Sequence, residues 1–185
     1  MAAKVWRLVA PKGLSQEAVL LGECNDTARE VINSCRGATL KSYFVFSKEN
    51  RRLHLRLFEP PESNRQSVQR CAVVYCPSEV SGGSCAMESA SLTRKLLPLG
   101  IAVLAIDVSP TATSLCTLDD VAYAVERLKE GLPNREPYPC VALWGRSAGA
   151  VAAIGYAAKD TPSLAGIVCD SAFSDLATLL QMPEW

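Results

Sequence analysis

Histidine is nearly absent from this sequence, since His54 is the only one among 185 residues. Eight cysteines are present, but none stands in a Cys-x-x-Cys pair, so the chain offers no credible set of zinc ligands. No Gly-x-Gly-x-x-Gly stretch follows the first predicted parallel strand, and the pair Gly82-Gly83 lacks that spacing. The sequence therefore predicts no metal site and no bound cofactor, and it makes a dinucleotide-binding protein a weak interpretation.

Net charge is also absent, because 19 basic residues balance 19 acidic ones. That balance argues against nucleic acid or a charged membrane surface as a partner. The apolar runs are only as long as strands, and the first residues lack the pattern of a secretory signal, so we expect no transmembrane segment and a cytoplasmic protein with reduced cysteines. Cysteines 71, 76, 140 and 169 lie in or beside apolar runs and are expected to behave as small buried hydrophobic residues.

The first half of the chain predicts an extension followed by a hairpin. Residues 1–36 are expected to form an N-terminal extension with a short helix that begins near Asn25-Asp26-Thr27. Strand-like runs at 40–46 and 53–58 predict an antiparallel hairpin. In the second run leucines alternate with other residues, which predicts a half-exposed strand with His54 on its solvent side among arginines.

From residue 71 onward, strand and helix patterns alternate. Continuous apolar runs at Cys71–Tyr75, Ile101–Ile106, Cys140–Trp144 and Ala165–Cys169 are typical of parallel strands that are covered on both faces. Helical segments are expected at 85–97, after the capping box that starts at Thr117, and at 148–159. The sequence thus predicts an α/β fold with a mostly parallel, doubly wound sheet, helices on both faces and one domain over residues 37–185.

One motif carries chemistry. Gly145-Arg146-Ser147-Ala148-Gly149 matches G-x-S-x-G, and it lies between a predicted buried strand and a predicted helix. That setting predicts a nucleophile elbow, a sharp turn that exposes the Ser147 hydroxyl and aims the Ala148 N–H and the helix dipole at a developing oxyanion. The alternative is a tight strand-to-helix turn whose serine has no catalytic role.

The elbow and the stretch Asp170-Ser171-Ala172-Phe173-Ser174-Asp175-Leu176 together resemble the α/β-hydrolase superfamily of serine hydrolases. The nearest resemblance is to small eukaryotic depalmitoylase-like and serine aminopeptidase-like members, which read W-G-R-S-M-G-A and D-S-P-F-S-D-L at these places. It implies hydrolysis of an acyl ester or thioester by Ser147, on a small acyl substrate or an acylated protein. It also implies an oxyanion hole completed by a backbone N–H of Ser78 or Glu79, although the same segment could be an ordinary surface loop.

The resemblance further implies an acid and a histidine after Ser147, and no histidine follows that residue. His54 is expected to be a surface residue rather than a substitute base. We therefore expect a chain truncated before both groups, in which hydrolysis is impaired or lost. The alternative function is a non-catalytic pseudo-hydrolase module. Its strand Ala165–Cys169 would lack an outer neighbour and could bind a partner or a second copy of the chain.

Overall fold

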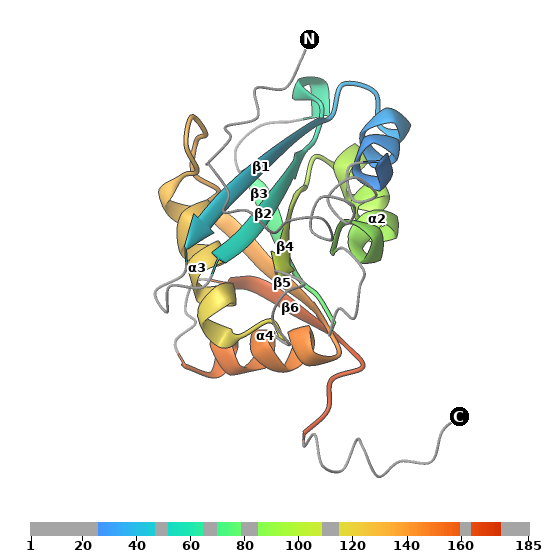
Figure 1. The fold of residues 1–185 in the computed structure, drawn as a ribbon. Coiled ribbons are helices and arrows are strands. Elements are labelled where there is room, and N and C mark those ends of the chain that lie inside the picture. Colours follow the sequence, from blue (N-terminus) through green and yellow to red (C-terminus); the bar gives the residue numbers. More distant parts are fainter. Residues whose placement is uncertain are drawn as a thin grey trace, which may run out of the picture.

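The computed structural model describes residues 26–46, 52–64, 70–78, 85–108, 115–159 and 164–174. Within them one sheet has the strand order β1-β2-β4-β3-β5-β6 (Figure 1). The strands are β1 (Thr39–Phe46), β2 (Arg52–Glu59), β3 (Cys71–Cys76), β4 (Ala102–Val108), β5 (Cys140–Arg146) and β6 (Leu164–Asp170). β2 runs antiparallel to β1 and β4, and the other pairs are parallel. The predicted hairpin and mostly parallel sheet are confirmed.

Helices cover both faces of the sheet (Figure 1). The helix at residues 26–34 and α2 (Cys85–Leu96) pack on one face, where their buried residues join those of β2, β3 and β4. α3 (Leu118–Glu130) and α4 (Ala148–Lys159) pack on the other face. The connections contain two short 3-10 helices, Glu62–Asn64 and Leu97–Leu99.

Local signals place the ends of these helices. At the start of α3, the Thr117 hydroxyl accepts a hydrogen bond from the Asp120 N–H at 3.3 Å, and the Asp120 carboxylate accepts one from the Thr117 N–H at 2.9 Å. This reciprocal pair is the predicted capping box. After α2, the turn Leu97–Leu99 ends at Gly100 with a φ of 79°, a left-handed conformation that glycine adopts without a Cβ clash.

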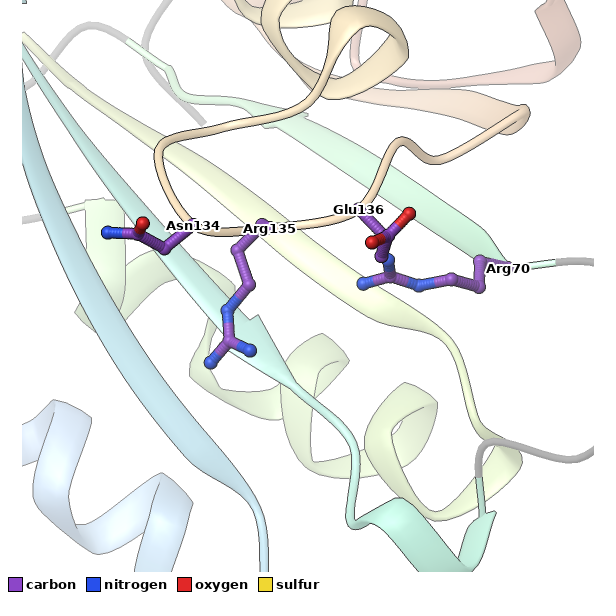
Figure 2. A pocket seen from close by; sticks show the side chains of 4 residues that line it. All are labelled: Arg70, Asn134, Arg135 and Glu136. Carbon is purple, nitrogen blue, oxygen red and sulfur yellow. The ribbon is translucent and has the colours of Figure 1, made fainter.

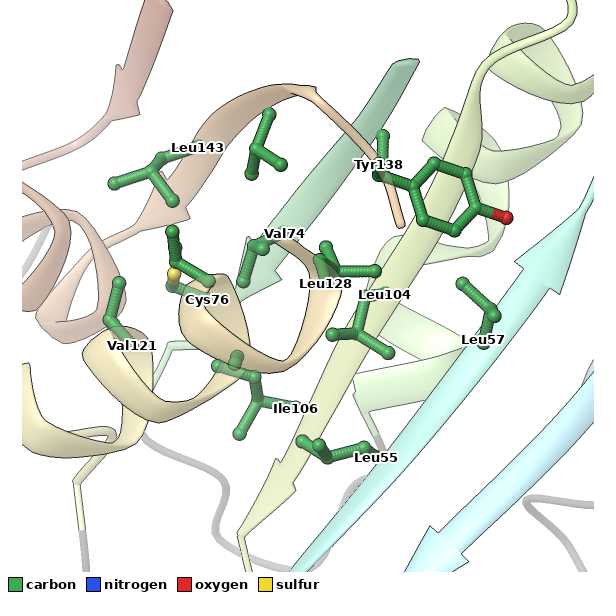
Figure 3. Packing of buried hydrophobic residues seen from close by; sticks show 14 of the residues in the cluster. Leu55, Leu57, Val74, Cys76, Leu104, Ile106, Val121, Leu128, Tyr138 and Leu143 are labelled. Carbon is green, nitrogen blue, oxygen red and sulfur yellow. The ribbon is translucent and has the colours of Figure 1, made fainter. Parts of the chain in front are cut away.

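The larger hydrophobic core lies between the sheet and helices α3 and α4 (Figure 3). β2 and β4 contribute Leu55 and Ile106, and α3 contributes Leu128, all of them fully buried. Removing any of these side chains would create a cavity and cost about 2–5 kcal/mol. Burial of these side chains therefore holds α3 against the sheet.

The prediction that β2 is half exposed is wrong. Arg56 and Phe58 are as buried as the leucines with which they alternate, and only about 11% of the His54 side chain is exposed. The physical reason is that β2 lies between β1 and β4 and that the second face is also covered by helices. The Arg56 charge is neutralised inside by Asp107, whose Oδ2 lies 2.7 Å from Nε.

The cysteines are less buried than their apolar surroundings suggested. Cys76 is buried as expected, whereas Cys71 and Cys140 are partly exposed and Cys169 is exposed. Cys169 is exposed because β6 is the last strand of the sheet and every residue from 165 to 170 on it is exposed. Among the described residues, no helix is both long and apolar enough to cross a membrane.

Candidate functional site

Ser147 occupies a sharp turn between β5 and α4. Its φ is +50°, a left-handed conformation that is strained for a residue with a side chain. The turn is held by hydrogen bonds: the Ser147 N–H donates to the Asp170 carbonyl at 2.8 Å, and the Ser147 carbonyl accepts from the Ala150 N–H at 3.0 Å. A strained serine that the surrounding bonds over-determine is an arrangement found at functional sites.

The two glycines of the motif are required by packing. A Cβ at Gly145 would lie 2.5 Å from the Ala150 Cα, and a Cβ at Gly149 would overlap the carbonyl oxygens of Cys76 and Pro77. Real Cβ atoms do not approach backbone this closely. Gly149 thus lets the N-terminus of α4 lie directly against the end of β3. The segment that follows β3 is thereby brought beside Ser147.

Arg146 and Glu88 flank this turn. Arg146 is half exposed, and its Nε lies 3.6 Å from Asp170 Oδ2 and 3.9 Å from Glu88 Oε1. Glu88 belongs to the first turn of α2, and its carboxylate also accepts hydrogen bonds from the Tyr75 hydroxyl at 3.1 Å and the Ser78 N–H at 3.2 Å. One carboxylate therefore links the ends of β3 and β5.

The sequence-predicted oxyanion donors lie as follows. Ala148 is the first residue of α4, so its N–H has no partner within the helix and lies at the positive end of the helix dipole. The Ser78 N–H follows the end of β3 and donates a hydrogen bond to the Glu88 carboxylate. Glu79 falls outside the described residues. A substrate oxyanion could use the Ser78 N–H only by displacing the Glu88 carboxylate.

His54 is far from Ser147, although both lie toward the carboxyl ends of the parallel strands. It is the register partner of Asp107, with its Nδ1 3.4 Å from Asp107 Oδ2, and it stacks on Phe44. β2 and β5 are separated by three strand spacings, which amounts to about 14 Å. A base must come within hydrogen-bond reach of the hydroxyl it activates, so His54 is not placed to activate Ser147.

A second polar cluster lies at the opposite end of the parallel strands, where β3 and β5 begin. There Glu59 is fully buried and receives a hydrogen bond from the Tyr138 hydroxyl at 2.8 Å and an ion pair from Arg135 at 2.8 Å. A pocket of about 370 Å³ beside it is lined by Arg70, Asn134, Arg135 and Glu136 (Figure 2). Arg70 precedes β3 and the other three precede β5, so this pocket is separated from Ser147 by the length of the strands.

Sequence reasoning missed Glu88 and Tyr75. Neither belongs to a motif, and their link depends on the way α2 returns over the sheet after β3. The available signal was the acidic residue in the first turn of α2, the helix that follows β3. In the described residues no three His, Cys, Asp or Glu side chains are grouped closely enough to hold a metal ion.

No protein-family model and no curated protein matches this sequence. Solved structures do match. The vibralactone cyclase structure has a TM-score of 0.63 at 16% identity, over 96% of this chain and 57% of its own. A bacterial heroin esterase has a TM-score of 0.62 at 14% identity, over 87% of this chain and 53% of its own. An α/β serine hydrolase without lid from Xanthomonas campestris has a TM-score of 0.50 at 23% identity, over 64% of this chain and 56% of its own.

The chain spans about half the length of these structures. Sequence identities this low carry no information on substrate, but the structural match extends over most of this chain. The chain therefore has an α/β-hydrolase fold.

Proposed function

We propose that this chain carries the nucleophile of a serine hydrolase, with Ser147 attacking an acyl ester or thioester. The observation that supports this most directly is the Ser147 backbone, held at φ +50° between two glycines that packing requires. A serine in this position presents its hydroxyl above the sheet, and the acyl group would be transferred to that oxygen before hydrolysis. The substrate would be a small acyl compound or an acylated protein.

The oxyanion that forms in such a reaction would be stabilised by the Ala148 N–H and the dipole of α4. Ser78 would contribute its N–H as the second donor once the Glu88 carboxylate moves away, and the Glu79 N–H stays a candidate. Gly145 and Gly149 would keep the turn narrow, and Arg146 would hold Glu88 and Asp170 beside it. Glu88 places a negative charge next to the developing oxyanion and would therefore slow the reaction.

For the chain as given we propose impaired hydrolysis. No histidine follows Ser147 in the sequence, and His54 lies about 14 Å away across the sheet. Without a base the hydroxyl stays neutral near pH 7. Enzymes that lose a member of the catalytic triad keep roughly 10³–10⁴-fold acceleration over water. We further propose that residues 37–185 form the hydrolase domain after an N-terminal extension, and that the protein is cytoplasmic.

The test is covalent labelling with an alkyl fluorophosphonate, followed by peptide mapping. We expect a slow adduct on Ser147 that disappears in Ser147→Ala. Ser171→Ala is the matched control, because Ser171 also has a positive φ, of 57°, at the end of the neighbouring strand. Absence of an adduct on Ser147 after long exposure, in protein that melts cooperatively, would contradict the proposed nucleophile.

A second arm tests the role of Glu88. In Glu88→Gln the charge beside the oxyanion is removed, and labelling of Ser147 should accelerate roughly 10-fold, which corresponds to about 1.4 kcal/mol. Glu130→Gln, an exposed residue at the end of α3, should leave the rate unchanged. If Glu88→Gln labels no faster than the parent chain, the carboxylate does not oppose the reaction.

One observation favours the alternative, a non-catalytic module. Among the described residues β6 is an edge strand of apolar sequence, and Ile167 and Val168 are 41% and 45% exposed. The occupant that fits best is a second copy of the chain, because a two-fold axis through Ile167 would pair the two β6 strands antiparallel with no like charges facing each other inside the strand. Such a dimer would continue the sheet from one copy into the other.

A further inference from the structure

Cys71 and Cys140 face each other at the start of two neighbouring strands. Cys71 begins β3, Cys140 begins β5, and the two are register partners in the parallel ladder. The two strands are hydrogen-bonded beside this pair, since the Cys140 N–H donates to the Arg70 carbonyl at 3.4 Å. Register partners in neighbouring strands have Cα atoms about 4.8 Å apart, within the range of about 4.4–6.8 Å that disulfides span.

The two side chains also point to the same face of the sheet. Tyr75 and Trp144, each four residues further along its strand, both pack in the core on the α2 side. Side chains alternate along a strand, so Cys71 and Cys140 share that face. Burial first, and then a hydrogen bond with the Cys140 thiol, raises the pKa of Cys71 to about 11.

This pair differs from the other described cysteines. Cys35, Cys76 and Cys116 are buried, and Cys169 lies exposed on the edge strand. Cys71 and Cys140 alone among the described cysteines are register partners, and both are partly exposed. The backbone therefore holds two partly exposed cysteines at disulfide spacing.

We propose that Cys71 and Cys140 form a redox-active dithiol, a modification site that a low-molecular-weight disulfide of the glutathione type converts to a cross-strand disulfide. One protein thiolate attacks a sulfur of the small disulfide, forms a mixed disulfide and releases one small thiol. The second protein thiolate then attacks the mixed disulfide and releases the other. The protein loses two electrons and two protons, and both end in the two small thiols.

The environment favours keeping the bond once it has formed. A dithiol is strongly oxidising when its reduced form is stabilised as a thiolate, as low thiol pKa values achieve. The Cys71 thiol has a raised pKa, so ionisation does not stabilise the reduced pair near neutral pH. The same raised pKa makes the first attack slow near neutral pH and faster as the pH rises.

The test uses the full, folded chain and does not depend on Ser147. Reduced protein is incubated with oxidised glutathione, the remaining thiols are alkylated, and the intact mass and disulfide-linked peptides are determined. We expect the loss of two hydrogens and a peptide that links residues 71 and 140. The reaction in urea should instead give mixed linkages, because unfolding removes the strand register.

The controls are single replacements. Cys71→Ser and Cys140→Ser should each abolish the linked peptide, while Cys169→Ser should leave it unchanged. A glutathione adduct that persists on Cys71 or Cys140 of the folded wild-type chain would overturn the proposal. So would a fully reduced pair after incubation at pH 9. Since the wild-type peptide map is itself decisive, the proposal stays testable if a serine variant fails to fold.

Discussion

Glu59 is a fully buried carboxylate whose charge is balanced by groups from separate segments of the chain. Arg135 and Tyr138 come from the segment before β5, and Arg70 from the segment before β3. Arg70 also stacks over the Tyr138 ring, 4.2 Å from its centroid. A buried carboxylate that loses a partner is strongly destabilising, so this cluster fixes the two strand ends relative to β2.

This cluster predicts a stability change at high pH. Burial, followed by the nearby Glu59 charge, raises the pKa of Tyr138 from 10.0 to about 12. The folded state thus holds the proton more tightly than the unfolded state. The resulting stability, roughly 2–3 kcal/mol, is fully present below pH 10 and is lost as the pH rises toward 12.

The measurement is the free energy of unfolding in urea at several pH values, for the wild type and Tyr138→Phe. The wild-type advantage should be constant up to about pH 10 and shrink above it, because phenylalanine does not ionise. Taking the difference between the two proteins cancels the titration of lysines. An advantage that stays constant up to pH 11.5 would show that folding does not raise the pKa of Tyr138.

Single residues were predictable where a motif or a local conformation determined them. Ser147 and its glycines could be identified because the turn requires them within five residues. The burial of His54 could not, since it depends on β2 lying between β1 and β4, and β4 is distant in the sequence. Glu88 was missed for the same reason, because its partners Tyr75 and Ser78 meet it through a tertiary contact.

At the scale of the elements, the contact between α4 and β3 predicts unequal effects of two glycine replacements. Gly149→Ala would press a methyl group into the backbone of Cys76 and Pro77 and should cost about 3 kcal/mol or more. Gly166→Ala on β6 meets nothing within 4 Å and should be neutral or slightly stabilising. Urea denaturation midpoints of the two variants provide the measurement, and similar midpoints would contradict the close helix–strand contact.

Strand and helix positions were largely predictable, whereas the neighbours of each strand were not. The continuous apolar runs gave β3 to β6 within two residues. Strands covered on both faces do not alternate, which fits β3, β4 and β5. The expectation that β6 is also covered on both faces is wrong, because its residues 165–170 are exposed. Hydrophobic pattern does not say which strand lies beside which. It therefore misjudged β2, which lies inside the sheet, and Cys169, which lies on its edge.

For the whole molecule, the exposed β6 edge predicts self-association. If two copies pair through β6, sedimentation should show twice the mass of one chain at micromolar concentration. Ile167→Lys should return the protein to the monomer, because a lysine beside its symmetry mate adds like charges to the shared ladder. Leu99→Lys, an exposed apolar residue after α2, is the matched control and should leave the dimer intact. A wild-type monomer at all concentrations would contradict pairing between copies.

The strand order has one more consequence. After β3 the chain crosses toward β4 by way of α2, and after β5 it crosses toward β6 by way of α4 on the opposite face. Neighbouring strands whose connections depart in opposite directions form a topological switch point, and a crevice opens between their carboxyl ends. In open α/β sheets ligands bind in that crevice whatever their chemistry. Ser78 and Ser147 follow the carboxyl ends of β3 and β5, so winding direction alone predicts a ligand site at the serine turn.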